Sequence, residues 1–262
     1  MTDVLVHNAH MESDSNLCLY LFFDGGEPPV LPSPYDEMEP EEHSVCLQEC
    51  DGMPALNTEL ERAGRVLNLV KGKGLILSIY RRQERVMAGA PAVCLSKDLL
   101  QRMSACGVGL DYSLYTSRWR ETRFRRVMSF FLLTFPQGGA GELPSDEPWL
   151  FAGEYRGQHF VLTPDIGALA AYLTYLADSG RQLPELRVDY FSAGSAVMWY
   201  LEAADEIRAL AALGCGVELR VHLAMLLSVT DPLFPLFRYL MRSTAWRSRL
   251  LPPPEQTEEE AR

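Results

Sequence analysis

A repeated pattern in the middle of the chain constrains its fold more than any other sequence feature. Residues 95–115 read as a capped helix, a Cys-Gly-Val break and then a strand, and residues 201–223 read the same way 109 positions later. The same offset relates the upstream helical patterns at 57–70 and 166–179. Self-similarity with a period close to the size of a domain indicates two related units rather than a solenoid.

Each unit is expected to have the order helix, strand, helix, strand. This predicts a mixed α+β fold of two pseudo-repeated units, each packing its helices on a small mixed sheet. The first unit should span residues 1–136 and the second 149–251. Residues 137–148, rich in Gly, Pro and acids, are the predicted linker. Residues 252–262, three prolines followed mainly by acids, are predicted to be a disordered tail.

Helix boundaries follow from capping signals. Asn57 or Thr58 is expected to cap the first helix and Ser96 the second, because short polar side chains accept hydrogen bonds from free backbone N–H groups. The longest helix is expected at 196–213 and should end at Gly214, since glycine readily adopts the left-handed conformation that closes helices.

The charge of the chain is strongly uneven. The formal net charge is −11, and residues 1–51 contain twelve acids but neither Lys nor Arg. Acidic termini can simply favour solubility, or an acidic arm can bind a basic partner. Residues 24–42 combine five prolines with acids, so they can form neither a helix nor a central strand. Long loops of this kind are commonly functional or disordered. The predicted partner-binding residues are Tyr35, Asp36, Glu37, Glu39, Glu41 and Glu42.

A second set of candidate residues is basic. Residues 117–126 hold five arginines interleaved with Trp119 and Phe124, and three further arginines follow the strand expected at 75–80. Such charges are typical of a solvated strand edge. Arginines beside aromatic rings also suit phosphate groups and nucleic-acid bases. The predicted anion-binding residues are Arg81, Arg82, Arg85, Arg118, Arg120, Arg123, Arg125 and Arg126.

No catalytic residue, metal site or cofactor is predicted. His43, Cys46 and Cys50 carry zinc-type donor atoms, but their spacing is not that of a standard zinc motif, and incidental thiols explain them as well. Ser192 follows an expected strand, yet the G-x-S-x-G pattern fails because Tyr190 occupies the position of the first glycine. A binding protein is therefore favoured over an enzyme.

The compartment is inferred from the cysteines and the N-terminus. Six unevenly spaced cysteines do not form a recognisable disulfide framework, which favours a reducing environment. The N-terminus has no signal-peptide pattern, and no apolar run approaches the length of a membrane span. A cytoplasmic protein without membrane contact is expected.

The duplicated segment, LSKDLLQRMSACGVGLDYSLY with its second copy, resembles the small α/β immunity or antitoxin proteins encoded beside bacterial polymorphic toxins. The resemblance lies in the helix followed by an edge strand and carries over no specific residues. It implies a non-catalytic inhibitor that binds a protein partner, such as a toxin domain. The acidic arm suits a basic partner, because opposite charges speed association.

Two alternatives from other functional classes remain open. An enzyme acting on an anionic substrate would gather the arginines at a cleft between the two units, a common place for ligands. A nucleic-acid-binding regulator would use residues 117–126, although the net acidity of the chain counts against it. The sequence predicts neither the oligomeric state nor the order of the strands.

Overall fold

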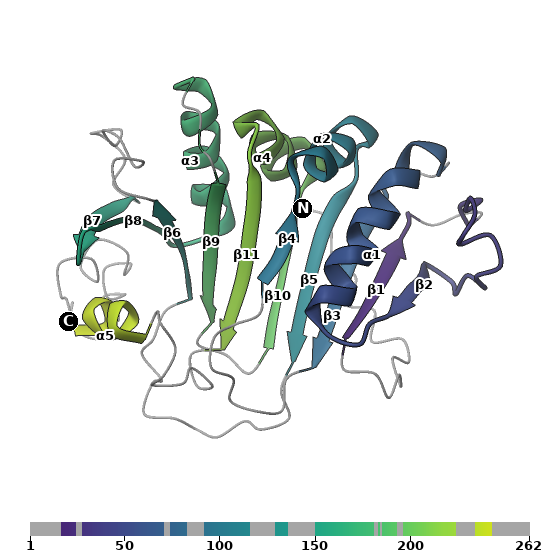
Figure 1. Cartoon of the computed structure of the whole chain (residues 1–262), viewed down its shortest axis with the longest axis horizontal. Coiled ribbons are helices and arrows are strands. Elements are labelled where there is room, and N and C mark those ends of the chain that lie inside the picture. Colours follow the sequence, from purple (N-terminus) through teal and green to yellow (C-terminus); the bar gives the residue numbers. More distant parts are fainter. Residues whose placement is uncertain are drawn as a thin grey trace, which may run out of the picture.

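The protein folds into two mixed β-sheets with helices packed against them (Figure 1). The mixed α+β class is therefore confirmed. The computed structural model describes residues 17–24, 28–70, 74–82, 92–115, 129–135, 150–180, 183, 185–192, 196–223 and 234–242. The predicted linker at 137–148 and the predicted tail at 252–262 lie outside these described residues.

The first sheet has the strand order β10-β5-β3-β1-β2. Its parallel pair is β3 and β5, and its other pairs are antiparallel. The strands are β1 (Leu17–Phe22), β2 (Ser44–Glu49), β3 (Ile76–Arg82), β5 (Gly109–Tyr115) and β10 (Ala196–Leu201).

The second sheet has the strand order β4-β11-β9-β6-β8-β7. Its parallel pair is β9 and β11. The strands are β4 (Ala92–Leu95), β6 (Phe130–Phe135), β7 (Phe151–Tyr155), β8 (Gln158–Thr163), β9 (Glu185–Ser192) and β11 (Gly216–Leu223).

The two sheets do not divide the chain at the predicted linker. Strand β4 comes from the first half of the chain but pairs with β11, and β10 comes from the second half but pairs with β5. Strand β6, placed by its sequence position in the predicted unit 1–136, pairs with β8 and β9. Each half therefore supplies strands to the sheet of the other, so neither sheet is built from residues 1–136 alone or from residues 149–251 alone.

The helices of the described residues are α1 (Met53–Val66), continued by the short η1 (Leu67–Leu69), then α2 (Lys97–Cys106), α3 (Ile166–Asp178), α4 (Arg208–Leu213), which follows η2 (Ala203–Ile207), and α5 (Phe234–Arg242). None of these helices is long and apolar enough to cross a membrane. Figure 1 shows α2 and α4 side by side where the two sheets meet, and the two helices are in contact.

The predicted N-cap of α2 agrees with the structure, whereas the predicted N-cap of α1 does not. The Ser96 side chain accepts a hydrogen bond from the backbone N–H of Leu99 at 3.1 Å, so the predicted cap of α2 is confirmed. Helix α1 begins four residues earlier than expected, with Gly52 at its N-cap position. The prediction that Asn57 or Thr58 caps it is therefore wrong, because both residues lie within the helix.

The helix predicted at 196–213 is also wrong over its first part. Residues 196–201 form β10, and only the following residues are helical, closing at Gly214 with φ 67°. An apolar run such as AVMWYL suits a buried strand as well as a buried helix, and its period does not separate them. Pairing with β5, in which Val197 lies opposite Leu114, selects the strand.

Corresponding elements recur in the two halves, although the repeat itself stays a prediction. The parallel strands pair Ile76 with Gly109 in the first sheet and Glu185 with Gly216 in the second. The upstream strands thus correspond at the predicted offset of 109, whereas Gly109 and Gly216 are 107 positions apart. The second unit is two residues shorter between its parallel strands.

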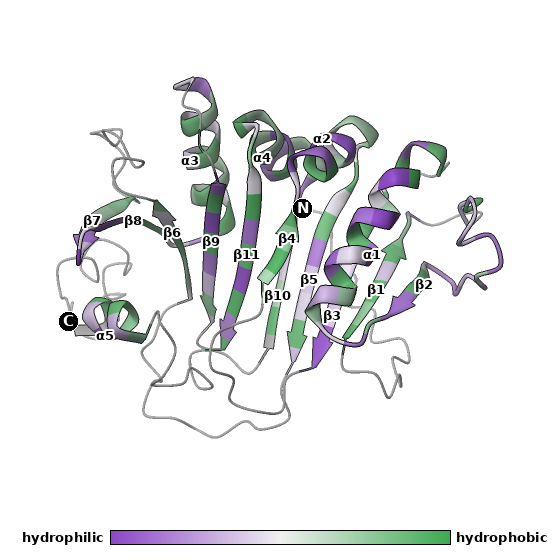
Figure 2. Cartoon of the chain, viewed as in Figure 1, coloured by the Kyte–Doolittle hydropathy of each residue, from purple (hydrophilic) through white to green (hydrophobic). Residues whose placement is uncertain are grey.

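One core joins the two sheets, because side chains from both, and from α1 to α4, belong to a single buried cluster. The rings of Tyr112 on β5 and Trp199 on β10 stack with centroids 5.5 Å apart. A smaller cluster lies between α5 and the opposite face of β6, β8 and β9. Figure 2 shows hydrophobic and hydrophilic residues alternating along β9 and β11, as expected for strands with one core face.

Candidate functional site

The acidic loop, defined here as residues 28–43, connects β1 to β2 at one end of the first sheet (Figure 1). Its base is closed by backbone hydrogen bonds. Phe23 N–H donates to the carbonyl of His43 at 3.1 Å, and Glu41 N–H donates to the carbonyl of Ser44 at 2.7 Å. Within the loop, Tyr35 N–H donates to the carbonyl of Pro32 at 2.9 Å. The described part of the loop therefore has a defined path.

Tyr35 anchors the acidic loop to α1. Its side chain is only 2% exposed, and its hydroxyl donates a hydrogen bond to the Glu59 carboxylate. Burial, and then the bond to Glu59, raise the pKa of Tyr35, so the phenol stays protonated and can donate. The prediction that Tyr35 contacts a partner is therefore corrected, because this side chain faces the core instead.

Glu59 of α1 is unusual for a glutamate because it is buried, with only 5% of its surface exposed. Besides the Tyr35 hydroxyl, its carboxylate accepts a hydrogen bond from Arg62 at 3.3 Å. A buried carboxylate is tolerated when such partners compensate for its lost hydration. The acidic loop is thus fixed through a polar contact that needs both α1 and the loop.

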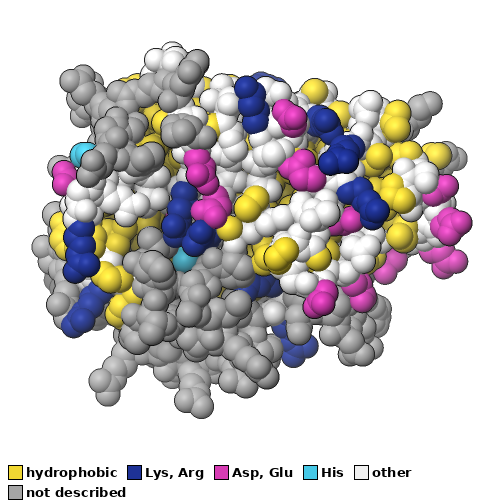
Figure 3. All heavy atoms as spheres, in the orientation of Figure 1, with side chains coloured by type: hydrophobic (Ala, Val, Ile, Leu, Met, Phe, Trp, Pro, Cys, Tyr) yellow, Lys and Arg dark blue, Asp and Glu magenta, His cyan; other side chains and the backbone are white. Residues whose placement is uncertain are grey.

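The five predicted carboxylates of the acidic loop are all exposed, namely those of Asp36, Glu37, Glu39, Glu41 and Glu42. In Figure 3 acidic side chains gather at the right of the view, where the acidic loop lies. Two hydrophobic side chains accompany them, with Val30 exposed to 77% and Met38 to 38%. Carboxylates around exposed apolar side chains can combine charge attraction with burial of apolar surface.

The predicted arginine cluster is covered only in part. Arg81 lies at the end of β3 with 6% exposure, and Arg82 beside it is exposed. The remaining six arginines of that prediction, Arg85, Arg118, Arg120, Arg123, Arg125 and Arg126, lie outside the described residues. The described residues therefore include only two of the eight predicted anion-binding side chains.

The three possible zinc ligands are engaged elsewhere. His43 lies 3.6 Å from the Glu42 carboxylate, and the Cys50 thiol is 3.9 Å from the carbonyl of Gln48. A hydrogen bond with Cys18, and then burial, raise the pKa of the Cys46 thiol. Burial raises the pKa of Cys50 to about 11. Nowhere in the described ranges do three potential metal-binding side chains come together.

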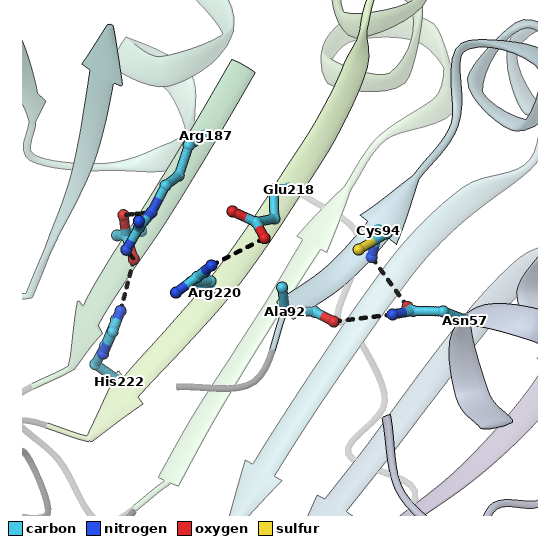
Figure 4. A network of polar contacts seen from close by, with 8 residues as sticks. Asn57, Ala92, Cys94, Arg187, Glu218, Arg220 and His222 are labelled. Carbon is cyan, nitrogen blue, oxygen red and sulfur yellow. Dashed lines mark hydrogen bonds and ion pairs between the residues drawn. The ribbon is translucent and has the colours of Figure 1, made fainter. Parts of the chain in front are cut away.

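A buried polar cluster on β9 and β11 was not predicted from the sequence (Figure 4). Asp189 is fully buried, and its carboxylate lies 2.7 Å from His222 Nε2 and 2.8 Å from Arg187 Nε. The ring of Phe191 stacks on the His222 ring, with centroids 4.5 Å apart. In the sequence, the polar residues of this cluster alternate with core residues along each strand, which places them on one face. The sequence does not show that the two strands are neighbours, and the cluster exists only because they pair in the fold.

A second unpredicted contact lies at the edge of the same sheet. The Asn57 side chain of α1 donates to the carbonyl of Ala92 at 3.1 Å and accepts from the N–H of Cys94 at 3.0 Å (Figure 4). These are the hydrogen bonds that a further strand would make with β4. The contact therefore blocks the outer edge of β4.

A third polar group lies on the first sheet, where Asp111 of β5 accepts hydrogen bonds from Ser78 at 2.6 Å and Ser113 at 3.3 Å. Burial raises the pKa of Asp111 even though both hydroxyls lower it. These three side chains lie on the face opposite the main core, because they alternate with Leu77 and Tyr112.

Searches against protein-family models, curated proteins and solved structures find no match for this chain. The assignment of a site therefore rests on the geometry alone. Among the described groups, the carboxylates of Asp189 and Asp111 are hydrogen-bonded to neighbouring side chains, whereas the carboxylates of the acidic loop belong to exposed residues. The acidic loop is the best candidate for a functional surface.

Proposed function

We propose that the protein is a non-catalytic binding protein of the immunity or antitoxin type, whose acidic loop binds a basic protein partner. The observation that carries the proposal is the presentation of five exposed carboxylates beside Val30 and Met38 by a loop that Tyr35 anchors to Glu59. A basic toxin domain in the cytoplasm is a partner of the required chemistry.

The anchored loop favours binding for an energetic reason. A loop whose path is already defined loses less conformational freedom when a partner binds, so more of the contact energy appears as affinity. The contact between Tyr35 and Glu59 and the backbone bonds at the base provide that order before binding. The carboxylates then attract a basic surface over a distance, which raises the association rate at low ionic strength.

The test is affinity capture of partners from host lysate with the tagged full-length protein, at low and moderate salt, followed by mass spectrometry. The key variant replaces the five exposed acids of the loop by lysine, at positions Asp36, Glu37, Glu39, Glu41 and Glu42. It should lose a basic, stoichiometric partner that the natural protein captures, and higher salt should weaken the capture.

A matched control carries the same change in net charge elsewhere. Lysine replaces five exposed acids outside the acidic loop, at Glu154, Asp178, Glu185, Glu202 and Asp205. The proposal expects this control to retain the partner. Equal capture by both variants, or loss of the partner from both, would show that the acidic loop is not the binding surface.

A further inference from the structure

The carboxylate of Asp111 on β5 has no positively charged partner among the described residues. Its side-chain hydrogen bonds come from neutral hydroxyls, those of Ser78 at 2.6 Å and Ser113 at 3.3 Å, and no ion pair within the described ranges includes it. On the second sheet, by contrast, Asp189 pairs with Arg187. A partly buried carboxylate without a counter-charge is unfavourable, because burial removes the hydration that stabilises the charge. Asp111 therefore offers a negative charge that a ligand can neutralise.

The register of the strands gathers large side chains around this carboxylate. Tyr200 of β10 lies directly opposite Asp111, and Met198 lies opposite Ser113. On the other side of β5, Tyr80 of β3 is also opposite Ser113. Residues directly opposite in antiparallel strands have Cβ atoms about 5 Å apart, and diagonal neighbours about 7–8 Å, a span that aromatic and other long side chains can cross. Both neighbouring strands therefore supply side chains within reach of Asp111.

Aromatic rings lie along β5 on both sides of Asp111. The Tyr115 ring is 5.5 Å from the Tyr80 ring between centroids, and the two planes meet at 36°. The Tyr200 ring covers Gly109, where an added Cβ would come within 2.4 Å of it, so the missing side chain makes room for this ring. Burial raises the pKa of both Tyr115 and Tyr200, and the negative charge of Asp111 acts in the same direction on each. Both phenols therefore lie within the electric field of the carboxylate.

The tyrosine face, defined here as Tyr80, Asp111, Tyr115, Met198 and Tyr200, can be reached from solvent. Met198 is 53% exposed, and the other four residues are partly exposed. The face is turned away from the main core, because its members alternate along β3, β5 and β10 with residues that pack into that core. A ligand can therefore contact the tyrosine face without any opening of the core.

The chemistry of the tyrosine face selects an organic cation. A tyrosine ring attracts a cation that lies within about 6 Å of its centroid. A carboxylate accepts strong, charge-assisted hydrogen bonds from an ammonium group. The rings and the Met198 thioether can also cover an apolar body, since aromatic and sulfur groups pack well on one another. Asp111 would repel an anion, whereas a neutral apolar ligand would leave the carboxylate without a counter-charge.

We propose that the tyrosine face binds a small aromatic amine in its protonated form, with the ammonium group at the Asp111 carboxylate and the aromatic body against the tyrosine rings. This goes beyond the proposed function, because the site lies on the first sheet and not in the acidic loop. A lysine side chain of a protein has the same ammonium group, but it carries a flexible aliphatic chain in place of a ring that can stack on tyrosine.

Phenethylamine is the probe, titrated into the full-length protein with isotope-labelled tyrosine and followed by NMR. The backbone signals of Tyr80, Tyr115 and Tyr200 should shift, whereas that of Tyr239 on α5 should not. Phenethyl alcohol has the same ring and chain without the charge, and its Kd should be higher by about tenfold or more. Nα-acetyl-lysine amide has the charge without the ring, and its Kd should also be higher by about tenfold or more.

Variants of the tyrosine face provide the protein side of the test. Asp111→Asn keeps the shape of the side chain and an oxygen that can accept from the serines, but removes the charge. It should weaken phenethylamine binding by about tenfold, to the level of phenethyl alcohol. Asp178→Asn, the same change at an exposed position of α3, should bind phenethylamine normally. Tyr80→Leu should weaken both ligands by about threefold or more, since both use the ring.

Three outcomes would overturn the proposal. Equal Kd values for phenethylamine and phenethyl alcohol, or an unchanged Kd in Asp111→Asn, would show that the carboxylate does not recognise the charge. The absence of shifts at the labelled tyrosines of the tyrosine face would exclude binding there. Equal binding of Nα-acetyl-lysine amide would replace the aromatic amine by a lysine side chain. The comparison of ligands uses the natural protein, so it decides the question even if Asp111→Asn does not fold.

Discussion

The side-chain oxygen of Asn57 accepts a hydrogen bond from the backbone N–H of Cys94 at 3.0 Å, so a helix of the first half of the chain closes the edge of a strand in the second sheet. The amide nitrogen of Asn57 also donates to the carbonyl of Ala92 at 3.1 Å. One planar side chain thus takes the place of a neighbouring strand, because an amide group offers the same donor and acceptor as a peptide bond.

Replacing Asn57 by alanine should destabilise the protein by about 1–3 kcal/mol, because two hydrogen bonds are lost and the backbone groups of β4 lose their partners. The measurement is urea unfolding together with hydrogen exchange of the Cys94 amide, which should become faster. Thr58→Ala, at an exposed position of the same helix, is the matched control. Unchanged exchange at Cys94 would contradict the assigned contact.

The contact between Tyr35 and Glu59 should be needed for both stability and binding. Tyr35→Phe removes the hydroxyl and leaves a buried carboxylate with one hydrogen-bond donor fewer, which should cost about 1–3 kcal/mol in the free energy of unfolding. Tyr239→Phe, whose side chain is 44% exposed, should change stability little. Equal urea midpoints for the two variants would show that the Tyr35 bond contributes nothing.

The buried Asp189 should be the most sensitive residue of the second sheet. Asp189→Asn leaves Arg187 and His222 beside a neutral group, and breaking a buried ion pair from one side costs about 3–5 kcal/mol. Adding Arg187→Gln should recover part of that loss, since it removes the unpaired charge. Urea unfolding of the single and double variants measures this coupling, and strictly additive effects would contradict it.

The carboxyl of Asp111 should make stability depend on pH in a defined direction. Burial raises its pKa in the native state above the ordinary value of 3.8, so the folded protein holds this proton more tightly than the unfolded chain does. The contribution to stability is therefore complete below pH 3.8 and is lost as the pH rises through the raised native pKa.

Asp111→Asn removes this titration, so its stability relative to the natural protein should increase as the pH rises from about 4 to about 7. Urea unfolding of both proteins across this range measures the difference, which cancels the titration of all other groups. Ser78→Ala should raise the native pKa of Asp111 further, because the Ser78 hydroxyl lowers it. A difference between the Asn variant and the natural protein that is independent of pH would contradict the assignment.

Local signals in the sequence were sufficient for much of the fold. Ser96 was predicted as the cap of α2, and Gly214 as the end of the helix before β11, because capping depends on residues within one turn of the chain. The strand expected at 75–80 was also found near its predicted position, as β3 (Ile76–Arg82). These elements depend on little beyond their own residues.

For the candidate site, the sequence identified the exposed carboxylates of the acidic loop but misassigned Tyr35. A tyrosine among acids and prolines has no local partner that would bury it, and Glu59 lies 24 positions away on α1. The contact of Asp189 with His222, 33 positions apart, was missed for the same reason. Neither pairing leaves a signal within a short window of the chain.

By itself, the sequence determined the mixed α+β class, most element types and the acidic character of the loop before β2, since these follow from short-range patterns and composition. Only the tertiary structure decided that residues 196–201 form a strand and that Tyr35 faces the core. It also decided that β4 pairs with β11 in the second sheet and β10 with β5 in the first. Strand pairing and burial depend on contacts between residues far apart in the chain, and no local pattern encodes them.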